Sequence, residues 1–266
     1  MEYHKFPGKI FAPLLRFKCM NLTTLLFITF LLTGFTTSDF KSEQKKYARV
    51  REAYAEKEAV VKSMLKSNAT SMESIQLLLI SYKAEQELEV WATDSKHSTF
   101  RKIITYPVCA GSGVPGPKVK SGDLQVPEGF YHISTFNPVS SYHLSLKVNY
   151  PNAADRIRSK GLNPGGDIFI HGKCVTIGCL PLTDDKIKEL YILAVEARNN
   201  GQEKIPVYIF PARFGRKLYK DLTISHKNNP ALISFWGNLE TGYRKFENDK
   251  RALHFSVSSK GIYQFQ

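Results

Sequence analysis

The chain has 266 residues, of which 42% are hydrophobic, 12% aromatic and 23% charged, and its formal net charge is +13. These values are ordinary for a globular protein of one or two domains, and they exclude a small scaffold that depends on disulfide bonds for its fold. The positive charge suits either a polyanionic partner or a well-solvated surface. No ladder of arginine and aromatic residues indicates nucleic acid, so we expect no nucleic-acid partner.

The N-terminus has the pattern of an export signal. An uncharged apolar stretch at residues 22–35 follows Arg16 and Lys18 and precedes a few small polar residues. The stretch is shorter than the roughly 20 residues of a membrane span. Phe35 stands where a lipoprotein signal has cysteine, so we expect no lipid anchor. Residues 1–38 are therefore predicted to be a signal peptide or, alternatively, an uncleaved N-terminal anchor, and both place the rest of the chain outside the cytoplasm.

The first segment after this signal has the pattern of a helix. Residues 39–66 contain no proline or glycine, and their apolar residues recur at steps of three and four. We expect residues 39–73 to form a helical segment that packs on the domain that follows. From Ile75 the pattern changes to short strands separated by turns. The expected strands of this part are residues 75–82, 88–94, 101–111, 130–136, 143–148 and 167–170.

Loops and a capped helix complete the pattern. Residues 111–129 are rich in glycine and proline, and a loop of this length inside a domain is often functional, as a lid or as the rim of a binding site. Thr183 is the predicted N-cap of a helix that stops at Asn200. A strand at residues 205–213 and a helix at residues 230–247 follow. Short strands with a few packed helices predict an α+β fold, mostly β, with a helix-containing extension over residues 216–266.

The residues with the clearest chemistry lie between Ile170 and Cys179. His171 ends the last short strand, and Gly178-Cys179 follows eight residues later. A cysteine nucleophile needs a base that takes its proton and backbone N–H groups that face the developing oxyanion. We therefore predict Cys179 as nucleophile, His171 as base and the Gly178 backbone as oxyanion donor, with Gly172 allowing close approach of the substrate. The alternatives are a structural cysteine and a histidine hydrogen-bonded in the core.

The other cysteines leave several interpretations open. Three cysteines follow residue 39, so at least one of them is unpaired within the chain. Cys174 is expected to be a small buried residue, a reversible disulfide partner of Cys179 or, with His171, a metal ligand. The metal reading has no fourth ligand nearby and a non-standard spacing, so we expect neither a metal nor another cofactor. Cys109 is expected to serve packing.

Four segments together resemble a known family. They are residues 112–133, 143–156, 170–191 and 207–214, and the third contains the His-Gly and Gly-Cys pairs. The combination resembles the L,D-transpeptidase (YkuD-type) catalytic domain. It is more similar to the murein L,D-transpeptidase-related subgroup, which includes the enzyme that detaches the outer-membrane lipoprotein from peptidoglycan. The resemblance covers about residues 75–214, and it implies a β-rich, sandwich-like catalytic domain, which we place at residues 74–215.

The resemblance implies roles for particular residues. The family's Ser-His-Gly-Cys motif falls on residues 176–179, so Thr176 supports the nucleophile Cys179, and Ile177 stands in place of a histidine. Tyr131 would help to bind the substrate near the oxyanion, or would pack in the core. Arg156 would hold a substrate carboxylate through a bidentate contact, or would be a solvated surface residue.

The resemblance also implies a reaction. A thioacyl-enzyme would form at Cys179, with peptidoglycan stem peptides as partners and, in one alternative, an outer-membrane lipoprotein linked to them. The spacing from His171 to Cys179 is shorter than in the classical transpeptidases, which favours hydrolysis of a diaminopimelate-linked amide. The alternatives are an L,D-transpeptidase that forms crosslinks or attaches a protein, and an inactive peptidoglycan-binding module. The chain would lie in the periplasm or cell envelope and would touch a membrane only through an uncleaved N-terminal segment.

Overall fold

The computed structural model describes residues 39–94 and 96–266. The predicted export signal at residues 1–38 lies outside the described residues. Within the described residues, none of the helices has the length and apolar character needed to cross a membrane.

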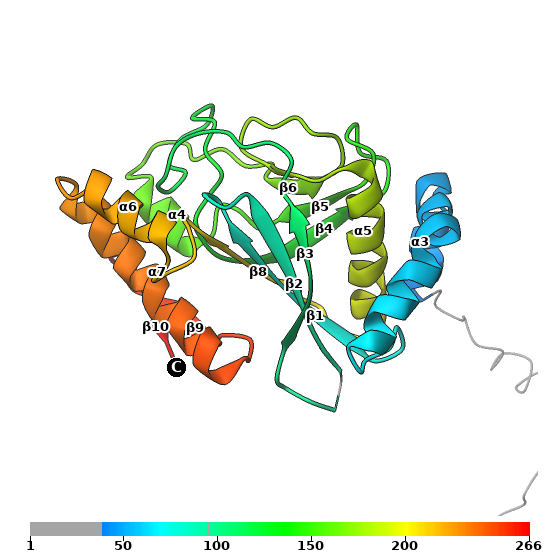
Figure 1. Cartoon of the computed structure of the whole chain (residues 1–266). Helices are drawn as coiled ribbons and strands as arrows, with labels where there is room; N and C mark the ends of the chain where they lie inside the picture. Colours follow the sequence, from blue (N-terminus) through cyan, green and yellow to red (C-terminus); the bar gives the residue numbers. More distant parts are fainter. Residues whose placement is uncertain (1–38, 95) are drawn as a thin grey trace, which may run out of the picture. The chain divides into compact units, whose positions relative to one another are not determined.

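Eight strands form one curled sheet in the order β3-β2-β1-β8-β4-β5-β6-β7 (Figure 1). The β1·β8 and β6·β7 pairs are parallel, and the other pairs are antiparallel. The strands are β1 (Ile75–Tyr82), β2 (Glu87–Asp94), β3 (Arg101–Pro107), β4 (Gly129–Asn137), β5 (Ser145–Val148), β6 (Phe169–His171), β7 (Leu180–Pro181) and β8 (Pro206–Phe210). The first two predicted strands, residues 75–82 and 88–94, pair as an antiparallel hairpin.

The sheet is covered on both faces, and alternation along β1 shows why. Leu77 and Leu79 belong to one buried cluster, whereas Leu78 and Ile80 belong to a second. Successive side chains of a strand point to opposite faces, so a strand that is apolar at nearly every position is buried on both sides. The sheet therefore separates two hydrophobic cores.

The helices divide between these two cores. The first core receives α2 (Phe40–Lys45), α3 (Ala48–Ser67) and α5 (Asp184–Asn199), with α3 packed on α5. The second receives α7 (Pro230–Asp249), the neighbouring α6 (Lys217–Ser225) and the small hairpin of β9 (Phe255–Val257) and β10 (Tyr263–Phe265). Two buried hydrogen bonds tie the N-terminal helices to α5: Tyr54 Oη donates to Glu196 Oε1 at 2.6 Å, and Tyr191 Oη donates to Gln44 Oε1 at 2.7 Å. The helical segment that precedes the sheet is thus part of the first core.

The elements largely follow the sequence pattern. Thr183 caps α5 as predicted, with its side chain accepting from the Lys186 N–H. The expected helix over residues 39–66 is two helices, α2 and α3, because the chain breaks at Lys46 and the extended residue Tyr47. The segment at residues 150–166 contains a short helix that the pattern did not indicate, α4 (Ala153–Arg158). The predicted α+β class with a β-rich catalytic domain is confirmed.

Candidate active site

The register of β5, β6 and β7 brings His171 and Cys179 to one face of the sheet edge. Ile170 pairs with Leu180, and His171 pairs with Pro181 and, on its other side, with Ser145. Paired residues share a face and next-but-one residues return to it, so Cys179, just before β7, lies on the face of His171. A short parallel pairing therefore places the base at the end of β6 and the nucleophile just before the neighbouring β7.

A cavity of about 300 Å³ contains both groups. It is lined by Asn137, Ser140, Ser141, Tyr142, Ser145, Asp167, Phe169, His171, Ile177 and Cys179. The ring of Tyr142 lies over that of His171, with centroids 4.6 Å apart and an interplanar angle of 37°. Tyr142 and Asp167 were not singled out from the sequence, because Tyr142 lies in a turn without a motif and Asp167 was taken only as the start of a predicted strand.

A second cavity of about 200 Å³ also reaches Cys179, from the side of the long loop. It is lined by Lys118, Ser121, Gly122, Leu124, Gly165, Gly166, Asp167, Ile168, Ile177, Gly178 and Cys179. Asp167 and Ile177 line both cavities and so stand between them. Both cavities therefore border Cys179.

The hydrogen bond of His171 identifies its free nitrogen. Nδ1 lies 2.5 Å from the carbonyl oxygen of Gly172. A carbonyl can only accept, so Nδ1 carries the proton in the neutral ring and Nε2 keeps its lone pair. Burial lowers the pKa of His171, with a smaller opposing effect from this hydrogen bond. The ring is thus held as a neutral imidazole with a basic Nε2.

The Cys179 thiol is protonated at rest. Burial raises its pKa, a backbone hydrogen bond opposes part of this rise, and the nearby Asp167 carboxylate raises the pKa a little further against the charge of Lys118. The sulfur lies 3.6 Å from the carbonyl oxygen of Asp167, which accepts its S–H. The free pair is therefore thiol and neutral imidazole, and a base must remove the thiol proton as the substrate reacts.

Thr176 organises the turn that carries the nucleophile. Its Oγ1 accepts from the N–H of Gly178 at 3.2 Å and of Cys179 at 2.8 Å, and donates to the carbonyl of Cys179 at 2.8 Å. The Gly178 N–H predicted to face an oxyanion and the neighbouring N–H of Cys179 are thus both engaged by the threonine hydroxyl in this structure. An oxyanion could reach them only by sharing or displacing that hydroxyl.

Gly178 is required by this turn. Its φ is +132°, and a Cβ on it would lie 3.0 Å from the carbonyl oxygen of Gln125. Only glycine adopts such a conformation without strain. The residue before the nucleophile therefore allows the backbone of the long loop to approach Cys179 closely.

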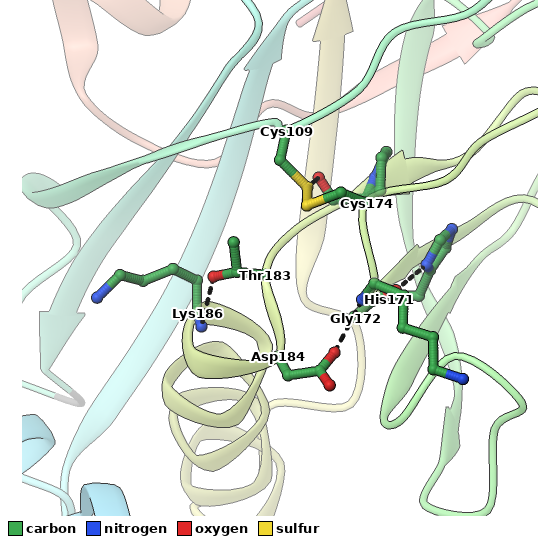
Figure 2. The surroundings of a disulfide bond; sticks show 9 residues. Cys109, His171, Gly172, Cys174, Thr183, Asp184 and Lys186 are labelled. Carbon is green, nitrogen blue, oxygen red and sulfur yellow. Dashed lines mark hydrogen bonds between the residues drawn. A yellow bond between two sulfur atoms is a disulfide. The ribbon is translucent and has the colours of Figure 1, made fainter.

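A disulfide joins Cys109 to Cys174, so the expectations for these two cysteines were wrong (Figure 2). Cys174 is exposed rather than buried, and its sulfur is bonded to Cys109 instead of Cys179 or a metal. Cys179 is the free cysteine of the described residues, in agreement with the odd number of cysteines. Asp184, at the start of α5, accepts from the Lys173 N–H at 2.9 Å. The segment between His171 and Cys179 is thus fixed at two neighbouring points.

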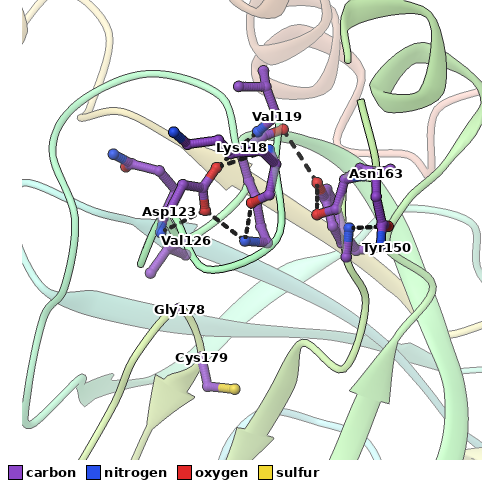
Figure 3. Close-up of polar contacts among 12 residues, drawn as sticks. Lys118, Val119, Asp123, Val126, Tyr150, Asn163, Gly178 and Cys179 are labelled. Carbon is purple, nitrogen blue, oxygen red and sulfur yellow. Dashed lines mark hydrogen bonds and ion pairs between the residues drawn. The ribbon is translucent and has the colours of Figure 1, made fainter. Parts of the chain in front are cut away.

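The long loop is held over the nucleophile by internal polar contacts (Figure 3). Asp123 accepts from the N–H groups of Val119, Lys120 and Gln125. The buried Lys118 ammonium donates to Asp123 at 2.5 Å. At its C-terminal end the fully buried Glu128 accepts from Lys83, Trp236 and the Gly116 N–H, each at 2.8 Å. These contacts make the loop a fixed rim of the second cavity.

Two residues expected to bind substrate lie away from the cavities around Cys179. Tyr131 is buried, and its hydroxyl is shared between the Glu128 carbonyl and the Asp155 carboxylate. Arg156 is exposed on α4 and lines neither of the two cavities. Gly172, in contrast, lies beside His171, and a Cβ on it would lie 2.6 Å from Asp184 Oδ1. The substrate roles of Tyr131 and Arg156 stay predictions.

A thiol and an imidazole with a free Nε2, in one cavity at a sheet edge, form the constellation of enzymes that use a cysteine for acyl transfer. Residues 76–209 match the YkuD family, which is described as the L,D-transpeptidase catalytic domain. The chain is 30% identical over 178 residues to the "Putative L,D-transpeptidase YafK" of Escherichia coli K12. The matched segment covers 66% of this chain and 68% of that protein.

Solved structures of lower identity were also found. The helical cell shape determining protein Pgp2 of Campylobacter jejuni is 19% identical, with a TM-score of 0.42 over 74% of this chain and 80% of that one. Mycobacterium tuberculosis L,D-transpeptidase 1 is 14% identical, with a TM-score of 0.29 over 51% and 62%.

The chain belongs to the L,D-transpeptidase (YkuD) family. Family membership supports a peptidoglycan-acting enzyme, and the resemblance read from the four sequence segments is confirmed.

Proposed function

We propose that this chain is an exported cysteine enzyme that hydrolyses a diaminopimelate-linked amide of peptidoglycan through a thioacyl intermediate on Cys179. One observation carries the proposal: Cys179 and His171 line the same cavity, and the Gly172 carbonyl holds the imidazole so that Nε2 can accept a proton. Family membership supplies the peptidoglycan stem peptide as substrate.

The reaction follows from the protonation states of the pair. His171 Nε2 takes the thiol proton while the sulfur of Cys179 attacks the amide carbonyl carbon. The C–N bond then breaks, and the leaving amine receives the proton from His171. A water molecule, deprotonated by the same nitrogen, attacks the thioester; the C–S bond breaks and the thiol regains its proton. The products are a free carboxylate and a free amine.

Acyl transfer to an amine is the second candidate, and the second cavity favours it. This cavity reaches Cys179 from the side of the fixed loop, whereas the first cavity contains His171. An acceptor amine could approach the thioester through it while the acyl group occupies the first cavity. Water and amine compete for the same thioacyl intermediate, so the two candidate functions differ only in whether water or an amine attacks the thioester.

The disulfide supports the proposed export. Disulfides persist in oxidising compartments and are rare in the cytosol. The Cys109–Cys174 bond therefore fits a periplasmic or cell-envelope location, as does the apolar stretch at residues 22–35. In that location the amine released on cleavage could belong to a crosslinked stem peptide or to a lipoprotein attached to peptidoglycan.

Intact-protein mass spectrometry tests the proposal. The mature chain is incubated with diaminopimelate-containing muropeptides, and wild type is compared with Cys179→Ala and with His171→Gln. We expect a thioacyl adduct on wild type, a released free stem peptide and no crosslinked product. Cys179→Ala should give no adduct, and His171→Gln should form it at least about 100-fold more slowly.

Other outcomes of the same experiment separate the alternatives. Crosslinked product would establish transfer to an amine in place of hydrolysis. Sedimentation with purified peptidoglycan, without adduct or turnover in any variant, would support the inactive binding module and overturn the enzymatic proposal. A protein–peptidoglycan conjugate is included among the substrates, so a lipoprotein linkage is tested directly.

A further inference from the structure

The cavity wall formed by residues 140–143 is held by a cation from outside the family domain. Arg49, in the first turn of α3, donates from Nη1 to the Ser140 carbonyl at 2.5 Å and to the His143 carbonyl at 2.8 Å. Lys173 Nζ donates to the Ser141 carbonyl between them at 2.8 Å. Three carbonyls of this short wall thus face fixed cations, and Arg49 provides two of the contacts.

The wall has little regular structure that could hold it otherwise. It lies between β4 and β5, where the chain forms turns, and His143 has a φ of +69°. A non-glycine residue in this region is strained and persists only where its surroundings fix it. The charge-assisted bond from Arg49 to the His143 carbonyl supplies such a contact.

The wall in turn contacts the candidate base. Ser140, Ser141 and Tyr142 line the cavity of Cys179, and the Tyr142 ring lies 4.6 Å from the His171 ring. Two contacts thereby define the position of the imidazole. The Gly172 carbonyl holds the His171 ring through Nδ1, and the Tyr142 ring packs against the plane of the imidazole. A shift of the wall would change the cavity and the packing of the imidazole together.

We propose that Arg49 is a positioning residue of the active site, which couples the N-terminal helices to His171 through the wall at residues 140–143. The family match begins at residue 76, so the contact comes from a segment that precedes the matched domain. The effect on turnover rests on the proposed function, whereas the effect on the geometry of His171 does not. The helices of residues 39–73 would then contribute to the site itself as well as to the first core.

Arg51 provides a matched control in the same helix. It is exposed like Arg49, and its Nη1 also donates to two backbone carbonyls, those of Lys45 and Lys46, at 3.0 and 2.7 Å. These carbonyls belong to the junction of α2 and α3 and line neither cavity of Cys179. Arg49→Met and Arg51→Met therefore remove the same type of contact, and only the first removes it from the cavity wall.

The test compares wild type, Arg49→Met, Arg49→Lys and Arg51→Met in the full mature chain. NMR shifts of the His171 ring protons report the ring current of Tyr142, and kcat/KM is measured with a diaminopimelate stem peptide. We expect Arg49→Met to move the His171 ring protons away from their wild-type shifts and to lower kcat/KM about tenfold. Arg49→Lys should restore most of the wild-type His171 shifts and of kcat/KM, because a single nitrogen of Arg49, Nη1, donates both hydrogen bonds. Arg51→Met should resemble wild type in both measurements.

Equal His171 shifts and equal kcat/KM in Arg49→Met and Arg51→Met would overturn the proposal, even if both variants lose stability. Should Arg49→Met not fold, Arg49→Gln, which keeps a shorter polar side chain, is measured in its place with the same criteria. If wild type turns over neither a stem peptide nor a protein–peptidoglycan conjugate, the proposed function fails, and the His171 shifts still decide the positioning role.

Discussion

His171 donates its Nδ1 proton to the carbonyl oxygen of Gly172, the next residue in the chain, at 2.5 Å. The acceptor of this hydrogen bond is the backbone carbonyl within the His-Gly pair itself, so no carboxylate side chain is needed to orient the base. Burial keeps the pKa of His171 low and that of Cys179 high, which leaves both groups neutral at rest.

This neutral pair predicts the pH dependence of the site. The base works when deprotonated, so kcat/KM should rise with pH through a pKa below the ordinary value of histidine and then stay level through neutral pH. Alkylation of Cys179 by iodoacetamide depends on the thiolate, so its rate should still climb above about pH 9. A level alkylation rate from pH 5 to 8 in stopped-flow or quench measurements would instead reveal a thiolate–imidazolium pair and contradict the prediction.

The disulfide is expected to stabilise the chain. It closes a loop between residues 65 positions apart, and loss of such a bond costs about 2–4 kcal/mol, chiefly through the unfolded state. Cys109→Ser, Cys174→Ser and the double variant should lower the free energy of unfolding in urea by the same amount. Dithiothreitol should destabilise wild type and leave the double variant unchanged. Different losses in the two single variants would show that one sulfur has another role.

The buried Glu128 is expected to be essential for the rim of the second cavity. Its carboxylate is fully buried and neutralises Lys83 while accepting from Trp236 and the Gly116 N–H. Removing one partner of a buried ion pair strands the other charge, so Glu128→Ala should lower the free energy of unfolding by about 3–5 kcal/mol. Asp221→Ala, which breaks an exposed pair with Lys217, should change it by less than about 1 kcal/mol. Equal effects in urea unfolding would refute this assignment.

Gly178 is expected to tolerate no side chain. Gly178→Ala puts a Cβ 3.0 Å from the Gln125 carbonyl at a φ of +132°, which should cost about 1–3 kcal/mol of stability and slow thioacyl formation by displacing Cys179. Gly237 in α7 is the control, because a Cβ there meets no atom within 4 Å. Gly237→Ala should leave the thioacyl rate unchanged and raise stability by up to about 1 kcal/mol. Calorimetry and adduct formation check both variants, and a fully active Gly178→Ala would rule out the steric argument.

Much of the fold was predictable because its signals are local. The apolar run at residues 75–82 and the cap at Thr183 report contacts within one strand or one helical turn, and both elements were found where the pattern placed them. The short helix α4 was missed, since its capping box of Asn152 and Asp155 lies in a polar segment without an apolar period. The break at Tyr47 was missed because residues 39–66 contain no proline or glycine that would mark it.

By itself the sequence determined the class of fold, the family and the presence of an unpaired cysteine, since motif spacing and the count of cysteines need no knowledge of distant contacts. Which cysteines pair, that Tyr142 rather than Tyr131 packs against the base, and that Arg49 contacts the cavity wall were decided only by the tertiary structure. Cys109 and Cys174 meet because the chain after β3 lies beside β7, where the Cys109 N–H donates to the Pro181 carbonyl, and Arg49 reaches the cavity wall because α3 packs on α5. These contacts join segments far apart in the chain, and their geometry depends on the order of the strands and the packing of helices on them, which no local pattern records.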